Sequence, residues 1–255
     1  MRVATWNVNG VRARLDFIRI WLQERRPDIV GLQEIKTEAD DFPHSTFEEL
    51  GYEVVLHGQK GWNGVAVLSR LPVEDSFRGL AGQEEMGARL VGASIGGLTF
   101  ATVYCPNGKS LEHEDFVGKL AWLDDLATFW SARNVGQGIL CGDFNVVPRA
   151  VDSWRGEDAD GQIFHTVEER SRFDALLGAG LADLFREKNP DSRAFSWWDY
   201  RAGAFRFGHG LRIDFLLGTP PVLARVNQVE IDRDFRKKKE GLTASDHAPV
   251  IADLD

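Results

Sequence analysis

Short apolar segments that end at polar residues recur along the whole chain, and amphipathic segments lie between some of them. Val3–Val8 and Asp28–Glu34 are rich in β-branched and apolar residues, which predicts two strands. Between them, Arg12–Arg25 places its apolar residues on one stripe at helical spacing, and Pro27 ends the predicted helix. The chain is therefore expected to begin with a strand, a helix and a second strand.

The rest of the chain predicts many more strands than helices. Phe116–Arg133 and Val167–Leu177 have the apolar spacing of helices. Strands are predicted at Tyr52–Gly58, Gly64–Arg70, Leu90–Ile95, Thr99–Tyr104, Gly138–Phe144, Ala194–Tyr200, Leu211–Gly218, Val222–Ile231 and Pro249–Leu254. These are too many strands for one sheet, and two sheets packed face to face with helices outside fit better. No linker interrupts the pattern, so residues 1–255 are expected to form one domain.

The composition is that of an ordinary globular protein. Of 255 residues, 43% are hydrophobic and 27% are charged, which excludes a disordered or fibrous chain. No apolar run approaches the roughly 18 residues that a membrane span needs, and the first residues lack a signal-peptide pattern. Cys105 and Cys141 lie in apolar segments and do not suggest a disulfide framework. We therefore expect a cytoplasmic protein that makes no contact with membranes.

The formal net charge of −9 argues against loose electrostatic binding to polyanions. A nucleic-acid substrate remains compatible with it, because the distribution of basic side chains matters more than their sum. The one dense basic run contains Arg233, Arg236 and Lys237–Lys239, and it precedes Asp246-His247. This run is either a solvated turn or a grip on phosphates.

A carboxylate or an amide ends several of the apolar strands. The stretches concerned are Trp6-Asn7-Val8-Asn9-Gly10, Leu32-Gln33-Glu34, Gly142-Asp143-Phe144-Asn145, Gly210-Leu211-Arg212-Ile213-Asp214 and Ser245-Asp246-His247-Ala248-Pro249. Buried charge is costly unless it is paired or metal-bound, so a shared divalent cation is the simplest common reason. Oxygen ligands without a Cys/His cluster favour Mg²⁺ or Mn²⁺ over Zn²⁺. Together with His247, such a site is typical of phosphodiester hydrolysis.

Each of these stretches also has a structural interpretation when it is taken alone. Glu34 could be a salt-bridged strand end, Asp143-Phe144-Asn145 could be a turn, and Asp246-His247 could be a structural pair. The functional interpretation is favoured because all of the stretches occur together.

The same stretches resemble the exonuclease III family of class II abasic-site endonucleases, within the endonuclease–exonuclease–phosphatase superfamily. The resemblance runs essentially end to end. It also includes Asn7–Arg14, Phe42-Pro43, Leu50-Gly51-Tyr52, Tyr104–Gly108, Glu168-Glu169-Arg170 and Phe195–Arg201. It implies an α/β fold, namely a four-layer αββα sandwich of two mainly antiparallel mixed sheets. The implied activity is Mg²⁺-dependent hydrolysis, with Mn²⁺ as a possible substitute.

The resemblance also implies roles for the candidate catalytic residues. Glu34 would be the principal metal ligand, oriented by Asn7, with Asp246 on the opposite side of the metal. Asp143 would orient or deprotonate the attacking water, although His247 is an alternative base. His247 would contact the phosphate and be fixed by Asp214. Asn145 would hold the water or the phosphate, and Tyr104 would donate to the phosphate or assist the leaving oxygen.

The implied substrate is double-stranded DNA with abasic sites or blocked 3′ ends, acted on by a monomer. The cut would lie 5′ to the abasic site and leave a 3′-hydroxyl and a 5′-deoxyribose phosphate, with 3′→5′ exonuclease or 3′-end-cleaning activity as a companion. The substrate-binding residues implied are Phe195, Trp197 and Leu211 for a small pocket, and Asn107, Lys119, Lys60 and Trp62 for the DNA backbone.

One departure and two alternatives remain. Arg149-Ala150 replace the Thr-Asp that usually follows the proline at this point of the family pattern, although Asp152 follows. The chain could instead be a non-specific deoxyribonuclease or another phosphoesterase of the same fold, such as a lipid or inositol phosphate hydrolase. From another class, it could be a non-catalytic protein that binds DNA ends.

Overall fold

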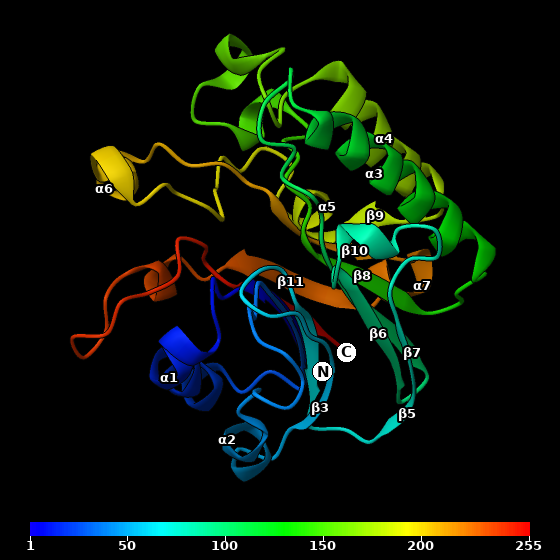
Figure 1. Cartoon of the computed structure of the whole chain (residues 1–255), viewed down its shortest axis with the longest axis vertical. Helices are drawn as coiled ribbons and strands as arrows, with labels where there is room; N and C mark the ends of the chain where they lie inside the picture. The colour runs from blue at the N-terminus through cyan, green and yellow to red at the C-terminus, as the bar shows by residue number, and fades with distance from the viewer.

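The computed structural model describes all 255 residues, and they form two six-stranded sheets that pack face to face (Figure 1). The first sheet has the order β11 (Val226–Ile231), β12 (Val250–Leu254), β1 (Arg2–Asn7), β2 (Ile29–Gln33), β4 (Val65–Ser69) and β3 (Glu53–His57). The second has the order β5 (Val73–Arg78), β6 (Leu90–Ile95), β7 (Leu98–Tyr104), β8 (Gly138–Asp143), β10 (Asp214–Gly218) and β9 (Ala182–Asp183). Only β1–β2 and β7–β8 pair in parallel, so the predicted mainly antiparallel mixed sheets are confirmed.

Helices cover the outer face of each sheet. Figure 1 shows α1 (Leu15–Arg25) and α2 (His44–Glu49) outside the first sheet, and α3 (Glu114–Ala132) and α4 (Val167–Gly178) outside the second. Three further helices are short: α5 (Leu184–Lys188), α6 (Ala204–Phe207) and α7 (Pro220–Leu223). The predicted four-layer αββα sandwich is therefore confirmed. No helix is long and apolar enough to cross a membrane.

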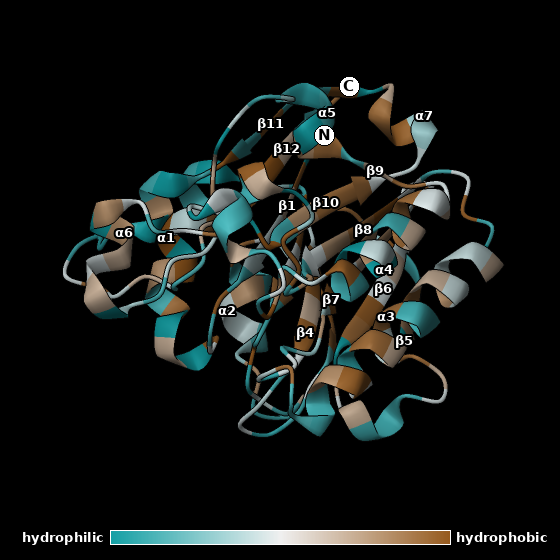
Figure 2. Cartoon of the chain, turned by 90° about the horizontal axis from the view of Figure 1, so that it is seen from above, coloured by the Kyte–Doolittle hydropathy of each residue, from teal (hydrophilic) through white to brown (hydrophobic).

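The central strands are apolar at nearly every position, because one face packs on the other sheet and the opposite face packs on helices. In β1, Val3 belongs to the core between the sheets, whereas Ala4 and Trp6 belong to the core beneath the helices of the first sheet. In β8, Cys141 faces the other sheet and Leu140 faces the outer helices. Successive side chains of a strand point to opposite faces, so each strand feeds two cores. Figure 2 shows central strands such as β8 and β10 mostly in brown, whereas the helices alternate between brown, white and teal.

Most of the predicted elements are present within a few residues. The first predicted helix begins with a 3₁₀ turn at Arg12–Arg14 before α1, and Arg26 ends α1 in a left-handed conformation. Helix α4 begins with a capping box, in which Thr166 and Glu169 satisfy each other's backbone N–H groups.

Two predicted strands are wrong in part or whole. Ala194–Tyr200 is not a strand, since only Trp197 makes isolated bridges, to Leu211 and to His247. The predicted strand Val222–Ile231 starts late, because the prolines after Thr219 open helix α7 and β11 follows it. The exposed edge strand β5 and the helix α2 were not predicted, because neither shows a clear apolar period.

Candidate active site

The register of the strands gathers the candidate catalytic residues at one rim of the sandwich. Asn7 pairs with Gln33 across the parallel strands β1 and β2, so Glu34 follows directly beside Asn7. In the second sheet Tyr104 pairs with Asp143, and Asp143 pairs with Asp214. Polar side chains that lie far apart in the chain are therefore neighbours across three strand pairs.

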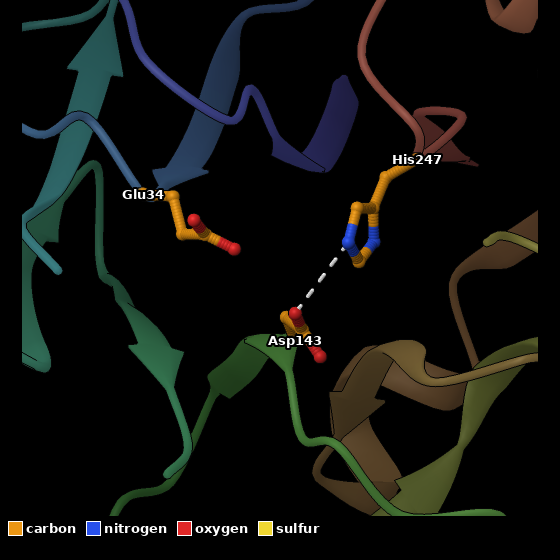
Figure 3. A group of neighbouring side chains, drawn as sticks. All are labelled: Glu34, Asp143 and His247. Carbon is orange, nitrogen blue, oxygen red and sulfur yellow. Dashed lines mark ion pairs between the residues drawn. The ribbon is translucent and has the colours of Figure 1, made fainter. Parts of the chain in front are cut away.

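Glu34, Asp143 and His247 converge from three different parts of the chain (Figure 3). Their ligand atoms all lie within 4.8 Å of one another. The Asn7 amide joins two of them, because Nδ2 lies 2.8 Å from Glu34 Oε1 and 2.9 Å from Asp143 Oδ2. Asn7 is buried and its own Oδ1 accepts a hydrogen bond from Asn9 N at 3.0 Å, which fixes the direction of the amide.

Several backbone conformations at this rim are ones that L-residues rarely adopt. Asn9, Glu34, Lys36 and Asn145 have φ values of 47°, 51°, 54° and 50°. Such left-handed conformations cost free energy and cluster at functional sites, where the surrounding structure holds them. Gly142, beside Asp143, has φ 140°, and a Cβ there would lie 1.9 Å from Val103 O. The end of strand β8, which carries Asp143, therefore requires glycine at this position.

The imidazole of His247 is held between two carboxylates. Nδ1 lies 2.9 Å from Asp214 Oδ2, and Nε2 lies 3.8 Å from Asp143 Oδ2. Asp214 is itself held by Ser196, whose Oγ donates to Asp214 Oδ2 at 2.6 Å and accepts from the backbone N–H groups of Ile213 and Asp214. Ser196 was not singled out in the sequence, although it lies within the Phe195–Arg201 stretch.

The two buried groups titrate far from their ordinary values. Burial lowers the pKa of His247, but the Asp214 carboxylate outweighs this effect and raises that pKa to about 10. Burial also raises the pKa of Asp143 to about 7, against the opposing charge of His247. At neutral pH His247 therefore keeps its proton as an imidazolium, whereas Asp143 can gain or lose one.

Tyr104 is placed as a hydrogen-bond donor. Burial, followed by the negative charges of Glu34 and Asp143, raises its pKa well above the ordinary value, so the phenol keeps its proton. The Arg89 guanidinium lies over the Tyr104 ring at 5.1 Å and donates to the Tyr104 carbonyl oxygen at 3.1 Å. Arg89 was missed in the sequence, because nothing near it in the chain marks a site.

Asp246 lies at the same rim but is not one of the three converging groups. Its carboxylate accepts hydrogen bonds from Asn9 Nδ2 at 2.9 Å and from Trp197 Nε1 at 3.0 Å. Lys36 Nζ bridges the two sides of the site, since it lies 2.5 Å from Asn9 Oδ1 and 2.8 Å from Glu34 Oε2. Glu34, Asp143 and Asp246 thus belong to one connected network, as the sequence pattern predicts. Lys36 was missed, although it follows Glu34 by only two residues.

The predicted DNA contact of Lys119 has to be corrected. Lys119 is completely buried on α3, where it forms an ion pair with Glu169 of α4. Its Nζ also donates to the carbonyl oxygen of Asn145 at 2.6 Å and to that of Asn107 at 3.3 Å. Burial lowers the pKa of Lys119, and the Glu169 carboxylate opposes this. Lys119 therefore holds the two loops of the site from below and does not face solvent.

The predicted pocket residues lie beside the site. Leu211 belongs to a small apolar cluster on which Trp197 and Phe164 pack. Phe164 was not predicted, and its φ of 72° is rare for an aromatic residue. Phe195 packs on the neighbouring cluster around Trp198.

Three predicted DNA contacts are exposed, as that role requires. Trp62 is 73% exposed, and Lys60 and Asn107 are also exposed. The loop that carries Lys60 and Trp62 reaches the site through Asn63, whose carbonyl oxygen accepts from Lys36 N at 3.0 Å.

The basic run near residue 236 is mostly engaged within the protein. Arg236 is buried and donates to the carbonyl oxygens of Asp246 and Trp198, at 3.0 and 3.1 Å. Lys237 and Lys239 both pair with Asp234. Arg236 therefore positions the loop of Asp246 and is not free to grip DNA.

Asp152 explains how the unusual Arg149-Ala150 loop is held. It is fully buried and pairs with Arg186 at 2.6 Å and with Arg212 at 2.7 Å. Arg212 N also donates to the Asp152 carbonyl oxygen at 2.8 Å, which fixes the segment that leads into Asp214. Asp152 therefore acts on the fold around the site and does not face it.

The donor set fits a hard divalent cation. The raised pKa of His247 favours its imidazolium, which donates hydrogen bonds and does not ligate a metal. The oxygens of Glu34 and Asp143 are the remaining ligand atoms of the converging group, and carboxylate oxygens suit Mg²⁺ or Mn²⁺. Glu34 pairs with Lys36, and the His247 imidazolium also lies within 4.8 Å of it.

Comparisons with known proteins agree with this geometry. The model of the endonuclease/exonuclease/phosphatase family matches residues 4–247. Exodeoxyribonuclease III of Haemophilus influenzae is 34% identical over 269 residues, which cover 100% of both chains.

Two solved structures are similar over the whole chain. The 3′ phosphatase NExo from Neisseria, bound to a product DNA hairpin, has 35% identity and a TM-score of 0.96, and the match covers 100% of this chain and 99% of that one. An AP endonuclease from Archaeoglobus fulgidus has 34% identity and a TM-score of 0.95, with the same coverage. The site geometry and these matches agree that the chain belongs to the endonuclease/exonuclease/phosphatase family, in which it is a nuclease of the exonuclease III type.

Proposed function

We propose that this chain is a Mg²⁺-dependent DNA repair nuclease that hydrolyses the phosphodiester 5′ to an abasic site. The products would be a 3′-hydroxyl and a 5′-deoxyribose phosphate. A 3′→5′ exonuclease or 3′-end-cleaning activity would accompany this reaction. The observation that carries the proposal is the network in which Asn7 joins Glu34 to Asp143 while His247 lies between Asp143 and Asp214. Relatives whose names include an exodeoxyribonuclease III, an AP endonuclease and a DNA-bound 3′ phosphatase support DNA as the substrate.

The metal would be held by Glu34, whose carboxylate Asn7 orients, with Asp246 as a second candidate ligand across Asn9. When bound, Mg²⁺ would supply a Lewis acid for a phosphate oxygen, and Mn²⁺ could substitute for it. The protein side of the site is already arranged for this task, because its carboxylates are fixed by amide and indole donors.

The other residues would handle the water and the phosphate. His247 would donate from Nε2 to a phosphate oxygen, since Asp214 holds the opposite nitrogen. Asp143 would orient the attacking water and accept its proton, since the His247 imidazolium already carries a proton on both ring nitrogens. Asn145 would hold the water or the phosphate, and Tyr104 would donate its phenolic proton toward the leaving oxygen.

Recognition would depend on the small apolar pocket beside His247. An abasic nucleotide has no base to unpair, so its extrusion from the duplex costs less than that of an intact nucleotide. Leu211, Trp197 and Phe195 would accept the bare sugar, while Lys60, Trp62 and Asn107 would contact the DNA backbone. All of these groups come from one chain, which favours action as a monomer.

Cleavage of one duplex with a single tetrahydrofuran abasic mimic tests the proposal. We expect a cut 5′ to the mimic that requires Mg²⁺, is abolished by EDTA and leaves the stated termini. The same duplex without the mimic is the control. Equal cleavage of both duplexes would favour a non-specific deoxyribonuclease, and binding without any cleavage would favour a DNA-end-binding protein.

A further inference from the structure

Three aromatic side chains form an exposed cluster outside the residues assigned above. Trp154 and His209 stack with ring centroids 3.9 Å apart and an interplanar angle of 19°. Phe207 lies beside them, with its centroid 5.8 Å from that of His209. Trp154 is 39% exposed and Phe207 is 63% exposed. Large aromatic rings gathered on a surface mark interaction sites more often than single exposed residues do.

The aromatic cluster of Trp154, Phe207 and His209 is connected to the active site by a short ladder of backbone contacts. His247 bridges Trp197, Trp197 bridges Leu211, and Leu211 bridges Ser153. Trp154 N then donates to the carbonyl oxygen of Gly210 at 3.0 Å. Neighbouring extended segments lie about 4.8 Å apart, so the cluster is on the order of 10–15 Å from His247. This distance corresponds to about three or four base steps of one DNA strand.

Three arginines lie near the aromatic cluster, although the chain as a whole is acidic and Glu157 and Asp158 follow Trp154 closely. Arg155, Arg193 and Arg206 are exposed, and none of them forms a salt bridge within the protein. Arg193 lies against the cluster, because its Nη2 donates to the Trp154 carbonyl oxygen at 2.5 Å. The Arg206 guanidinium lies 5.8 Å from the Phe207 ring. Arg155 and Arg193 donate only to uncharged oxygens within the protein, so none of the three charges is neutralised by a carboxylate.

Helix α6, which ends at Phe207, projects away from the two sheets at the end of a long segment (Figure 1). Gly203 and Gly208 flank it, and both have left-handed φ values, of 64° and 72°. The helix is anchored by Phe205, which packs edge-on against the buried Trp198 at 5.0 Å. Phe207, two residues further on, lies on the opposite side of the same helical turn and is turned to solvent.

We propose that the cluster of Trp154, His209 and Phe207 is a stacking platform for an unpaired base of the DNA substrate. The inference rests on the proposed function and extends it, because it predicts a preference for DNA with single-stranded nucleotides next to the scissile bond. Aromatic rings bind any base through its π face, and adjacent arginines hold the backbone. A pair of rings that is already stacked offers a flat outer face at little cost in side-chain entropy. The platform would therefore act without regard to base sequence.

Binding of two fluorescein-labelled DNAs in EDTA tests the platform separately from cleavage. One DNA is a blunt duplex. The other is the same duplex with a tail of four unpaired thymidines, which is prepared in two versions, with the tail at a 3′ end or at a 5′ end. We expect the wild type to bind at least one tailed duplex more tightly than the blunt one, as measured by fluorescence anisotropy. W154A and F207A should each weaken binding of that tailed duplex about fivefold or more and change blunt binding less than twofold. W154F should retain the preference.

V117A and V167A are matched controls, since these valines are 69% and 72% exposed on the outer helices. Thermal unfolding checks that each variant folds. If W154A fails to fold, F207A still tests the platform, because Phe207 is strongly exposed and its removal disturbs the fold less. Equal losses on tailed and blunt DNA would overturn the platform, as would a wild type without tail preference. Abasic cleavage in Mg²⁺ is measured on the same preparations. If the wild type cuts the abasic duplex but binds tailed and blunt DNA equally, the platform alone is disproved. If it prefers tailed DNA but never cuts the abasic duplex, the proposed activity is disproved.

Discussion

The Nδ1 atom of His247 lies 2.9 Å from Asp214 Oδ2, and this contact fixes the ring so that Nε2 faces Asp143. The register of the second sheet produces the arrangement, because Asp214 of β10 pairs directly with Asp143 of β8. A carboxylate that holds one imidazole nitrogen decides what the other nitrogen can do. Here it makes His247 a donor toward the position between Asp143 and Glu34.

Replacement of Asp143 by Asn should separate binding from cleavage. The amide keeps the shape of the side chain but removes the group whose pKa burial raises to about 7. We expect the rate of abasic cleavage to fall by about two orders of magnitude or more, with DNA affinity changed only a few-fold. D174N, on the exposed face of α4, is the matched control. Unchanged cleavage would remove Asp143 from the mechanism.

Replacement of Glu34 by Gln should weaken metal binding directly. The variant loses a carboxylate charge, while the contact between Asn7 and the side-chain oxygen can persist. We expect the Mn²⁺ dissociation constant, measured by electron paramagnetic resonance, to rise about tenfold or more. Cleavage should recover in part at high Mn²⁺. E38Q removes the same charge four residues away, and a similar effect of both variants would point to general electrostatics.

Much of this site could be predicted from the sequence, because strand ends carry its main residues. Asn7, Glu34 and Asp143 each end an apolar run, and the ends of parallel and suitably paired strands meet at one rim. The register itself cannot be read from the sequence. It is the register that places Asp214 opposite Asp143 and leaves Asp246 one step away, held by Asn9 and Trp197.

Lys119 shows why other residues were misplaced. A lysine is usually solvated, yet Lys119 lies three residues before Trp122 and four before Leu123, on the buried stripe of α3. Glu169 occupies the same kind of position on α4, four residues before the buried Phe173. Two opposite charges on the buried stripes of facing helices are a signal for an internal pair. The segment Ala194–Tyr200 was predicted as a strand because it is rich in aromatic residues. Its rings instead pack in the small clusters beside the site, and the segment joins no sheet.

The Asp214 carboxylate should control the titration of His247. In EDTA, Asp214 raises the pKa of His247 to about 10 against the opposing effect of burial. The imidazolium then contributes stability that is complete below the ordinary pKa of about 6.5 and is lost as the pH rises through the folded-state value. We expect D214N to lower the pKa of His247 by several units, as measured by NMR of the ring protons. The half-buried His44, which lies outside the site, is the internal reference, and an unmoved His247 signal would contradict the prediction.

The buried pair of Lys119 and Glu169 should matter more for the loops of the site than for the helices that carry it. K119M leaves the Glu169 carboxylate buried without a cation and frees the carbonyl oxygens of Asn145 and Asn107, so unfolding in urea should show a loss of about 3–5 kcal/mol. K119M/E169Q removes both charges but keeps a side-chain oxygen for the capping box of α4, so its stability should recover by at least half. Because the double variant still lacks the ammonium that holds Asn145, its abasic cleavage should stay well below that of the wild type. Recovery of cleavage in parallel with stability would show that the pair serves the fold alone.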